Sequence, residues 1–459
     1  MSNLCYRLTS LFKLILPHKT NRLMKNIRNL VFIIVFLASG NLSAQENISI
    51  SKASVLKKIS EQNLMLKISQ EEFNKAKAEY IQTNAVYLPN ITASHTGIST
   101  TNPLMAFGSK LNQEILTATD FNPILLNNPK QIQNFATKIE IRQPLINLDG
   151  MYQRKAAKSK MQAMSLQTER VSDYLILEVE KTYMQLQLAY QGVSVLEKAL
   201  ITAKANTELA TNNFQKGYLQ RADVLLVEVR VTEVKNQLQK AKSNVQNASD
   251  YLSFLMNDKG YVVYHPTDSL TIQPFVENSG IISNNRADIK AMSLVSDAYK
   301  SMNKANQMSF LPRLNAFGSY ELYDNKIFQA SANGYLVGAQ LSWDIFKGSK
   351  RFGKNQQSKA EFEKSKLEYD QYLSKSNLEL NKAKRVLTDA ENKLKLTKLA
   401  SEQSEEALRI RSNRFKEGLE KTTDLLGAET QYAQKQLEYY QTIFEYNFAQ
   451  SYLQFLTKK

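Results

Sequence analysis

The sequence contains very little cysteine, glycine or proline. It has one cysteine, 15 glycines and 9 prolines in 459 residues, and the cysteine is Cys5. The flanks of Cys5 do not resemble a lipoprotein cleavage site, and the rest of the chain has no residue for disulfide or thiolate chemistry. Scarce glycine and proline, combined with abundant Lys, Glu, Gln, Leu and Ala, predict long helices.

Patterns typical of catalysis and of nucleic-acid binding are also missing. No Ser/His/Asp order, metal-ligand spacing or glycine-rich phosphate loop occurs. His95 and His265 are far apart in the sequence, so we predict no metal site and no cofactor. The net charge is +16, but acidic residues lie between the basic ones, unlike the basic tails that bind nucleic acid. We therefore expect neither an enzyme nor a nucleic-acid partner.

Residues 1–44 have the pattern of a secretory signal peptide. Lys25 and Arg28 precede the apolar run Leu30–Leu37, and Leu42-Ser43-Ala44 resembles a cleavage site. Met24 is an alternative start. The apolar run is too short to cross a bilayer as a helix, and no later segment offers about 18 consecutive apolar residues. The sequence therefore predicts an exported protein without a transmembrane helix.

The remaining chain is a duplicated pattern, with a first repeat at residues 45–256, a linker at 257–285 and a second repeat at 286–459. Each repeat is predicted as helix, strand pair, long helix, tip and helix. The expected bounds in the first repeat are 50–86 (helix), 88–145 (strand pair), 151–216 (long helix), 214–223 (tip) and 223–256 (helix). In the second they are 286–309, 312–345, 350–416, 415–424 and 424–456. A stretch at 99–134, within the first strand pair, is predicted to be irregular.

The two tips share a spacing of residues. Phe214–Asp223 reads FQKGYLQRAD and Phe415–Asp424 reads FKEGLEKTTD. Glycine is typical of a helix end, and Asp can cap the helix that follows, so both stretches predict a turn between two helices. A single copy would be a weak signal, but the matched duplication strengthens it.

Apolar residues after the first tip follow a heptad spacing. Ten positions between Val224 and Leu255 are separated by alternating steps of three and four residues, which predicts coiled-coil packing. They are Val224, Val227, Val231, Val234, Leu238, Ala241, Val245, Ala248, Leu252 and Leu255. The lengths also suggest that two shorter helices lie end to end beside each long one. We expect a bundle about 100 Å long, with the strands at one end and the tips at the other.

The predicted strands are apolar on one face and polar on the other. Such alternation over 9–11 residues fits a membrane β-barrel, but it also fits a soluble sheet that packs on the helices. If the sheet lies in a bilayer, four strands cannot close it, and a dimer or a larger ring is required. The polar face supplies the candidate lumen residues, which are Lys138, Glu140, Arg142, Gln340 and Asp344.

Taken together, these features resemble the TolC-like outer membrane efflux proteins. The resemblance rests on the signal peptide, the duplicated halves, the Tyr87-Leu88-Pro89 start of the first strand pair, its Gln143-Pro144-Leu145 to Gly150 end, and the paired tips. It implies a mainly α protein with a β-barrel part. Three chains would form a 12-stranded barrel in the outer membrane and an α-helical tunnel through the periplasm.

The resemblance also implies a function and partners. The homotrimer would be a passive exit duct of a tripartite efflux or type I secretion system, in contact with outer membrane lipid, a periplasmic adaptor protein and an inner-membrane pump. The tips would dock on the adaptor through Phe214, Gly217, Leu219, Asp223, Phe415, Gly418, Leu419 and Asp424. Asp424 would be a periplasmic gate or only a helix cap. The long loop would plug or decorate the outer mouth, or be a flexible surface loop. The alternative function is a periplasmic coiled-coil protein that forms no channel.

Overall fold

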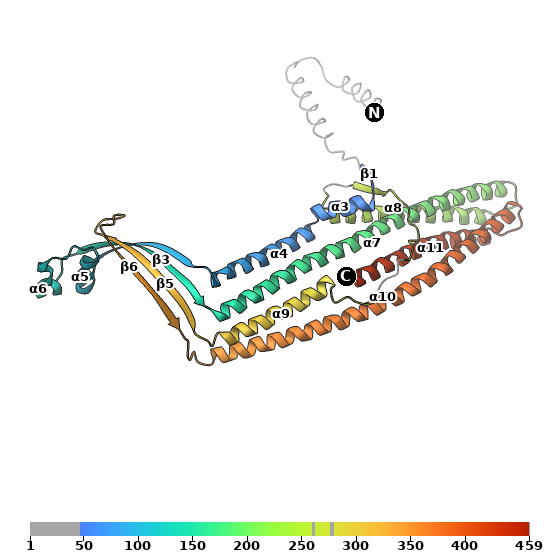
Figure 1. The fold of residues 1–459 in the computed structure, drawn as a ribbon. Helices are drawn as coiled ribbons and strands as arrows, with labels where there is room; N and C mark the ends of the chain where they lie inside the picture. Colours follow the sequence, from blue (N-terminus) through green and yellow to red (C-terminus); the bar gives the residue numbers. More distant parts are fainter. Residues whose placement is uncertain (1–45, 259–261, 276–279, 459) are drawn as a thin grey trace, which may run out of the picture.

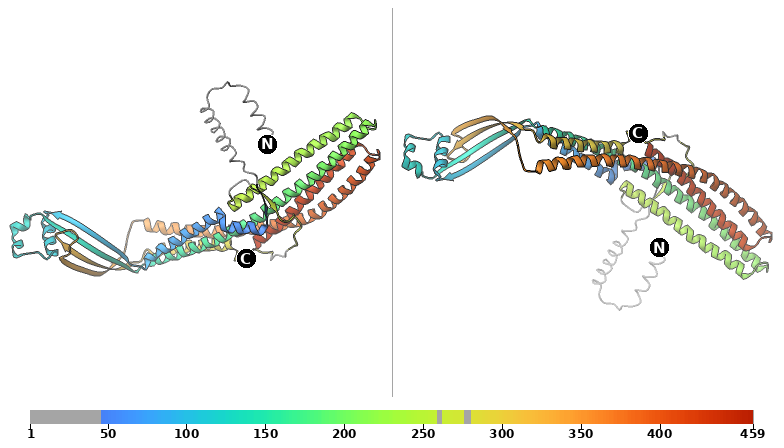
Figure 2. Two further views of the ribbon diagram at one scale, coloured as in Figure 1. Left: turned by 90° about the horizontal axis from the view of Figure 1, so that it is seen from above. Right: turned by 90° about the horizontal axis from the view of Figure 1, so that it is seen from below.

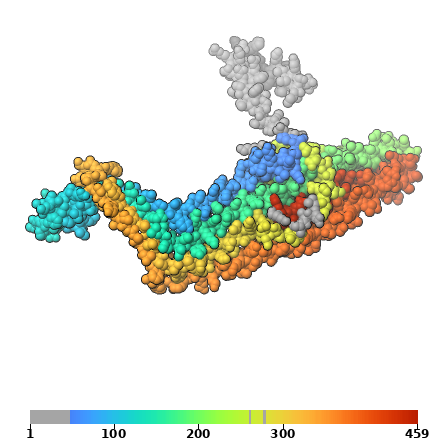
Figure 3. Space-filling model, in the orientation of Figure 1, coloured from blue at the N-terminus to red at the C-terminus, as the bar shows by residue number. Residues whose placement is uncertain are grey.

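The computed structural model describes residues 46–258, 262–275 and 280–458, so the predicted signal peptide lies outside the described residues. The chain forms an elongated molecule with long helices at one end and a sheet at the other (Figures 1 and 3). The helices are α3 (Lys52–Gln62), α4 (Leu64–Gln82), α5 (Pro103–Asn112), α6 (Pro123–Asn127), α7 (Leu148–Gln215), α8 (Arg221–Met256), α9 (Ala287–Met308), α10 (Lys350–Lys416) and α11 (Thr422–Thr457). Two 3₁₀ helices are η3 (Thr83–Val86) and η4 (Ala118–Phe121).

Six strands form two separate sheets. Strands β2 (Asn90–Thr100), β3 (Ile132–Ile146), β5 (Arg313–Asp324) and β6 (Ala332–Ser342) form an antiparallel sheet in the order β2-β3-β5-β6. Within the described residues, β2 and β6 are therefore edge strands with one free side each. The second sheet pairs β1 (Glu46–Ile50) with β4 (Val262–Pro266) in parallel. The sequence analysis predicted neither strand of this small sheet, because each is short and its partner is distant in the chain.

The helices next to the large sheet follow the order of its strands. Helices α4, α7, α9 and α10 lie side by side and continue from β2, β3, β5 and β6 respectively (Figure 1). Farther from the sheet, α8 packs on α7 and α11 packs on α10. The predicted arrangement of two shorter helices beside each long one is therefore present in both halves, since α4 and α8 both pack on α7, and α9 and α11 both pack on α10.

Matched hydrogen bonds hold the two end-to-end junctions. Asn63 caps α4 and its side-chain amide donates to the Leu255 carbonyl, near the end of α8, at 2.7 Å. Arg286 stands at the start of α9 and donates to the Leu456 carbonyl, near the end of α11, at 2.9 Å. Both donors are buried, so each satisfies a carbonyl that the helix end would otherwise leave unpaired. The duplication thus extends to the chemistry of the junctions.

Asn63 also corrects the prediction of one helix over residues 50–86. The backbone of Asn63 is extended, with φ −60° and ψ 129°, and it separates α3 from α4. An asparagine that caps a helix with its side chain interrupts the preceding helix. The sequence pattern did not indicate this break, because no glycine or proline occurs near Asn63.

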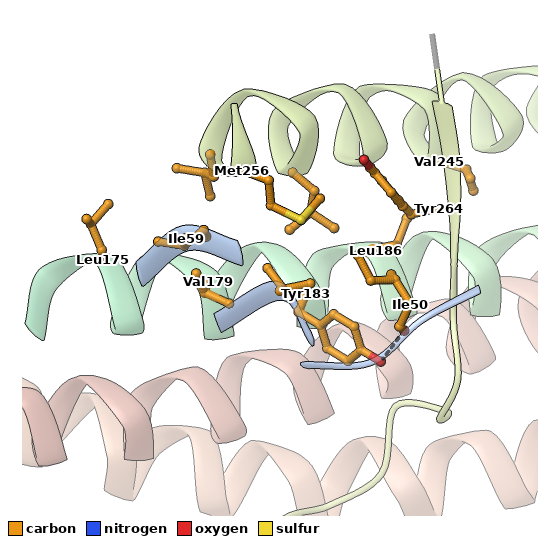
Figure 4. Close-up of a cluster of buried hydrophobic side chains, with 12 residues drawn as sticks. Ile50, Ile59, Leu175, Val179, Tyr183, Leu186, Val245, Met256 and Tyr264 are labelled. Atoms are coloured by element: carbon orange, nitrogen blue, oxygen red, sulfur yellow. Dashed lines mark hydrogen bonds between the residues drawn. The ribbon is translucent and has the colours of Figure 1, made fainter. Parts of the chain in front are cut away.

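A buried apolar cluster lies where α3, α7, α8 and the small sheet meet (Figure 4). Its members include Tyr183, Tyr264 and Met256, all at most 2% exposed. The Tyr183 hydroxyl donates to the Ile50 carbonyl at 3.1 Å, which fixes β1 against α7. Burial, with a hydrogen bond to Asp268, raises the pKa of Tyr183 to about 12. The cluster holds the middle of the bundle together.

The heptad prediction for α8 is confirmed. Eight of the ten apolar positions are buried in α8, and the other two, Val231 and Ala248, are half-buried. This face lies against α7, as a coiled-coil seam requires.

Candidate functional site: a polar sheet face and two helix tips

One face of the large sheet carries interlocked charged residues. Lys138 Nζ lies 3.2 Å from Glu140 Oε2 on the same strand and 3.2 Å from Glu321 Oε1 on the neighbouring strand. Arg142 also pairs with Glu140. The register places Lys138 opposite Glu321, so these side chains form one continuous polar row across β3 and β5. Glu321 was not among the predicted lumen residues, and only the pairing of β3 with β5 reveals its contact with Lys138.

The same face borders a large open hollow. Its volume is about 1220 Å³, and Lys138, Glu140, Arg142 and Gln340 all line it. Gln340 lies opposite Asn315, which places two amide side chains beside the charged row. The face therefore presents a wet, polar wall of mixed charge.

The prediction of a strand that extends to residue 345 is wrong, because β6 ends at Ser342. Asp344 therefore does not belong to this wall. Strand β6 ends at Ser342, whose partner is Arg313, the first residue of β5. Pro312 precedes Arg313 and has no N–H to donate, so the ladder cannot continue in that direction. Asp344 instead pairs with Lys347 at 2.5 Å beyond the strand.

The opposite face of the sheet is apolar and exposed. The register aligns Ile91, Ile141, Gly318 and Val337 in one row, and the adjacent row contains Ile139, Tyr320 and Tyr335. Val337 is 75% and Tyr335 is 81% exposed. The sheet extends beyond the helix ends instead of packing on their sides (Figure 1). A continuous exposed apolar face is unfavourable in water and suits a partner or a lipid environment.

The two tips have the same backbone geometry. Gly217 has φ +79° and Gly418 has φ +74°, in the left-handed region that favours glycine. In the first tip the Tyr218 N–H donates to the Asn213 carbonyl at 2.9 Å, and in the second the Leu419 N–H donates to the Arg414 carbonyl at 2.9 Å. These six-residue closures, with the glycine one position earlier, are Schellman motifs. Both turns lie at the same end of the molecule (Figure 2).

The equivalent phenylalanines of the tips differ in burial. Phe214 is 39% exposed, whereas Phe415 is 2% exposed. We therefore assign Phe415 to the packing of its tip rather than to a docking surface. Leu219 is half-buried, while Leu419 and Tyr218 are exposed. Tyr218 was absent from the predicted docking residues, although its place directly after the glycine could have indicated it.

Asp223 and Asp424 lie inside the first turn of the returning helices, not at the capping position. Helix α8 begins at Arg221 and is capped by Gln220, whose N–H donates to Asp223 Oδ2 at 3.1 Å. Asp223 is thus the reciprocal partner of a capping box, and the prediction that it is the cap itself is corrected. Helix α11 begins at Thr422, so Asp424 also occupies the third helical position. A carboxylate there is favourable at the positive end of the helix dipole.

The second tip has an ion-pair cluster that the first lacks among the described residues. Glu420 lies 2.9 Å from Arg411 and 2.9 Å from Arg414, and Arg411 also lies 3.8 Å from Asp424. The cluster ties the end of α10 to the start of α11 across the turn. Sequence analysis missed it, because the partners are separated by the turn and no helical spacing connects them.

A buried polar cluster lies close behind the tips. The Asn206 side chain of α7 donates to the Glu429 carboxylate of α11. Glu429 and Arg230 of α8 both line a small cavity of about 60 Å³. Glu429 and Arg230 are each 6% exposed, and Arg230 Nε has no hydrogen-bond partner in the described part of the chain. Burial raises the pKa of Glu429 to about 6, although Asn206 and Arg230 oppose the shift. The cluster joins three helices, and sequence analysis did not detect it.

None of the helices within the described ranges is long and apolar enough to cross a membrane.

The sequence was compared with family profiles and with curated proteins. A sequence profile described as outer membrane efflux protein matches residues 55–258 and 280–455. A search of curated protein sequences finds no significant match.

Solved structures share the fold. A structure of CusC, described in connection with transmembrane channel formation, has a TM-score of 0.77 and 14% identity, with 88% of this chain and 91% of that chain covered. The CmeC outer membrane channel of Campylobacter jejuni gives 0.76 and 17%, with coverage of 91% and 90%. The open state of the MtrE outer membrane channel of Neisseria gonorrhoeae gives 0.70 and 16%, with coverage of 87% and 88%.

Proposed function

The chain belongs to the outer membrane efflux protein family, and from this premise we propose that three copies form the exit duct of a tripartite efflux or type I secretion system. Family membership makes the protein an outer membrane efflux channel and not an enzyme. The proposal adds to this that the channel is a trimer, that it works with an adaptor and a pump, and that single residues have the roles given below.

The open four-stranded sheet carries the proposal. Its apolar face is exposed, its polar face lines a hollow, and its edges β2 and β6 have no partner within the described chain. An open edge in a bilayer leaves backbone groups unpaired, so the sheet must close with other copies. Two copies would give an eight-stranded barrel, whose interior side chains fill. Three copies give twelve strands and leave room for a conduit.

The helices extend the conduit away from the membrane. Helix α7 has 68 residues and α10 has 67, so each is about 100 Å long. This length supports a tunnel through the periplasm, with the tips at its inner end. The exposed side chains there, Phe214, Tyr218 and Leu419, support docking of an adaptor protein that links the duct to an inner-membrane pump. Passage itself needs no chemistry from the polar wall.

The second tip supports a gate. Asp424 is exposed, and its only close cation in the described chain is Arg411 at 3.8 Å. Three copies of this residue around an axis would form an acidic ring at the tunnel mouth. Asp223 is engaged in its capping box, so we assign it a structural role.

Cross-linking between β2 and β6 tests the ring. The chain after residue 44 has no cysteine, so Ser94→Cys on β2 can be combined with single cysteines at residues 334–342 of β6. Two strands separate β2 from β6 within one chain, a distance of about 14 Å that excludes an internal disulfide. Oxidation should give covalent trimers at one register, whereas each single cysteine should give no trimer. Absence of intermolecular products at every register would refute the ring.

Conductance tests the duct. Purified trimers in planar bilayers should form channels, and the protein should be recovered in the outer membrane fraction with heat-modifiable migration. A trimer that conducts no ions in its native form, with Asp424→Ala, or with Asp424→Ala and residues 101–131 replaced by a two-residue turn would overturn the proposal. Recovery as a freely soluble periplasmic protein would favour the structural coiled-coil alternative.

A further inference from the structure

The segment between β2 and β3 is built as a folded unit. Residues 101–131 contain α5, η4 and α6, and they lie at the end of the sheet opposite the long helices (Figure 1). Lys110 pairs with Asp120 at 2.5 Å, and the rings of Phe107 and Phe121 meet edge to face at 5.7 Å. Asn102 caps α5 with its side chain. These contacts connect the pieces of the segment, which is therefore not an irregular loop.

The segment packs on the polar face of the sheet. Gln113, at the end of α5, is buried and donates to the Gln133 carbonyl and to Asn134 Oδ1, both at 2.8 Å. Asn134 precedes Lys138 by four residues on β3, so its side chain lies on the same face as the charged row. The orientation of α5 is therefore toward the candidate lumen and not toward the apolar outer face.

Burial at the sheet end supports the same placement. On the polar face, Ile132, Asn134 and Ala332 are at most 9% exposed, although they lie near the outer ends of their strands. On α5, Ala106 and Ser109 are 1% and 4% exposed. Helix α5 contacts both β3 and β6, so it crosses the face above β5. Small residues on both sides allow this close approach.

The segment exposes an unusual number of large apolar side chains. They are Leu104, Met105, Leu111, Ile115, Phe121, Ile124 and Leu125. Leu104 is 82% and Ile124 is 77% exposed. Apolar side chains that are exposed in such number, on a segment that lies over a polar wall, favour a covering partner. The nearest surface of matching chemistry in a closed ring is the same segment of the neighbouring copies.

The width of a 12-stranded barrel is compatible with contact between the α5 helices of three copies. Twelve strands spaced about 4.8 Å apart and tilted by about 40° close into a ring about 24 Å across. The axis of such a ring lies about 12 Å from each sheet, and a helix is about 10 Å in diameter. A copy of α5 on the inner face of each sheet therefore lies within reach of the same helix in the other copies.

We propose that residues 101–131 of the three copies meet at the axis and close the outer mouth of the channel. The closure rests on the proposed trimer. It would be a second barrier, separate from the periplasmic tips, and transport would require the apolar contacts between copies to open.

Labelling from outside the cell tests the closure independently of the tips. Gln340→Cys places a single thiol on the polar wall of a chain that is otherwise free of cysteine after residue 44. Intact cells are treated with a hydrophilic maleimide too large for general diffusion porins. Asn325→Cys, exposed in the β5–β6 turn, is the positive control for display of this end of the sheet outside the cell.

A deletion provides the comparison. Thr100 and Ile132 are paired directly, so Asn-Gly can replace residues 101–131 as a two-residue hairpin turn. We expect labelling of Gln340→Cys to be at least about tenfold faster in the deletion variant than in the full chain, because access through a pore depends on its diameter. Equal labelling rates in the two chains would overturn the closure. Failure to label Asn325→Cys would instead contradict the proposed membrane orientation.

Substitutions cover the case in which the deletion does not assemble. Leu104→Ser combined with Ile124→Ser removes exposed apolar contacts between copies and leaves the anchor of Gln113 intact. This variant should also label faster than the full chain. Phe328→Ser, which alters an exposed aromatic residue of the other turn, is the matched control and should leave labelling unchanged.

Discussion

Protonation of Glu429 should control how readily the tip helices open. The carboxyl has an ordinary pKa of 4.5, and burial raises its pKa to about 6 in the folded chain. The folded state therefore holds a proton more tightly than the opened state between these values. The stability that this proton provides is complete below about pH 4.5 and is lost as the pH rises through 6, which corresponds to about 2 kcal/mol.

The effect of pH can be measured through the equilibrium constant for local opening of the tip helices. If local opening exposes Glu429 to water, the equilibrium constant for opening should rise about eightfold between pH 5 and pH 7.5. Glu429→Gln mimics the protonated carboxyl, so it should remove this dependence and protect the tips at neutral pH. Glu228→Gln is the matched control, because it removes an exposed carboxylate from the neighbouring helix.

Hydrogen exchange is the suitable assay. Protection factors for residues 224–233 and 425–433, corrected for the intrinsic effect of pH on exchange, should fall with rising pH in the parent chain and in Glu228→Gln. They should stay level in Glu429→Gln. If the protection factors of the parent chain do not depend on pH, the buried carboxyl is not the cause. The same holds if the protection factors of Glu429→Gln change with pH as those of the parent do.

Four further substitutions test three other features. Gly217→Val and Gly418→Val should each cost about 1–2 kcal/mol at the tip, because a side chain resists the positive φ; efflux-dependent drug or metal tolerance should fall while the amount of outer membrane trimer is unchanged, and full tolerance would make the tips simple turns. Asn63→Ala should lower the free energy of unfolding by about 1–2 kcal/mol, since a cap and a buried hydrogen bond are both lost; a thermal melt identical to that of the parent would contradict this. Asp149→Asn should lower the temperature at which the trimer dissociates on a gel, because the buried carboxylate accepts two hydrogen bonds from Arg313 at the junction of sheet and helix; Asp149→Glu is the charge-preserving comparison.

Several features of the fold were predictable because they depend on local spacing. The heptad positions of α8 are buried as predicted, since a period near 3.5 residues places them on one face. The tip glycines adopt positive φ because a helix that ends in a Schellman motif needs a left-handed residue. The polar face of the sheet followed from the two-residue alternation of strands, apart from Asp344, where the partner strand had already ended.

Features that depend on distant partners were not predictable in the same way. Phe214 and Phe415 occupy equivalent places in matching motifs, yet one is 39% and the other 2% exposed, so the motif alone does not determine their burial. Strand β1 pairs with β4, and α5 contacts the polar face of the sheet. In both cases the sequence pattern of one segment does not indicate which segment it contacts.

The sequence by itself thus determined the duplicated plan, the long helices, the turns between them and the two faces of each strand. Their cause is local, since backbone geometry and side-chain periodicity act over a few residues. Only the tertiary structure decided that Glu429 is buried beside Asn206, that Glu420 binds Arg411 and Arg414, and that residues 101–131 cover the polar wall. Those contacts arise from the order in which helices and strands pack, and that order places residues together that are far apart in the chain.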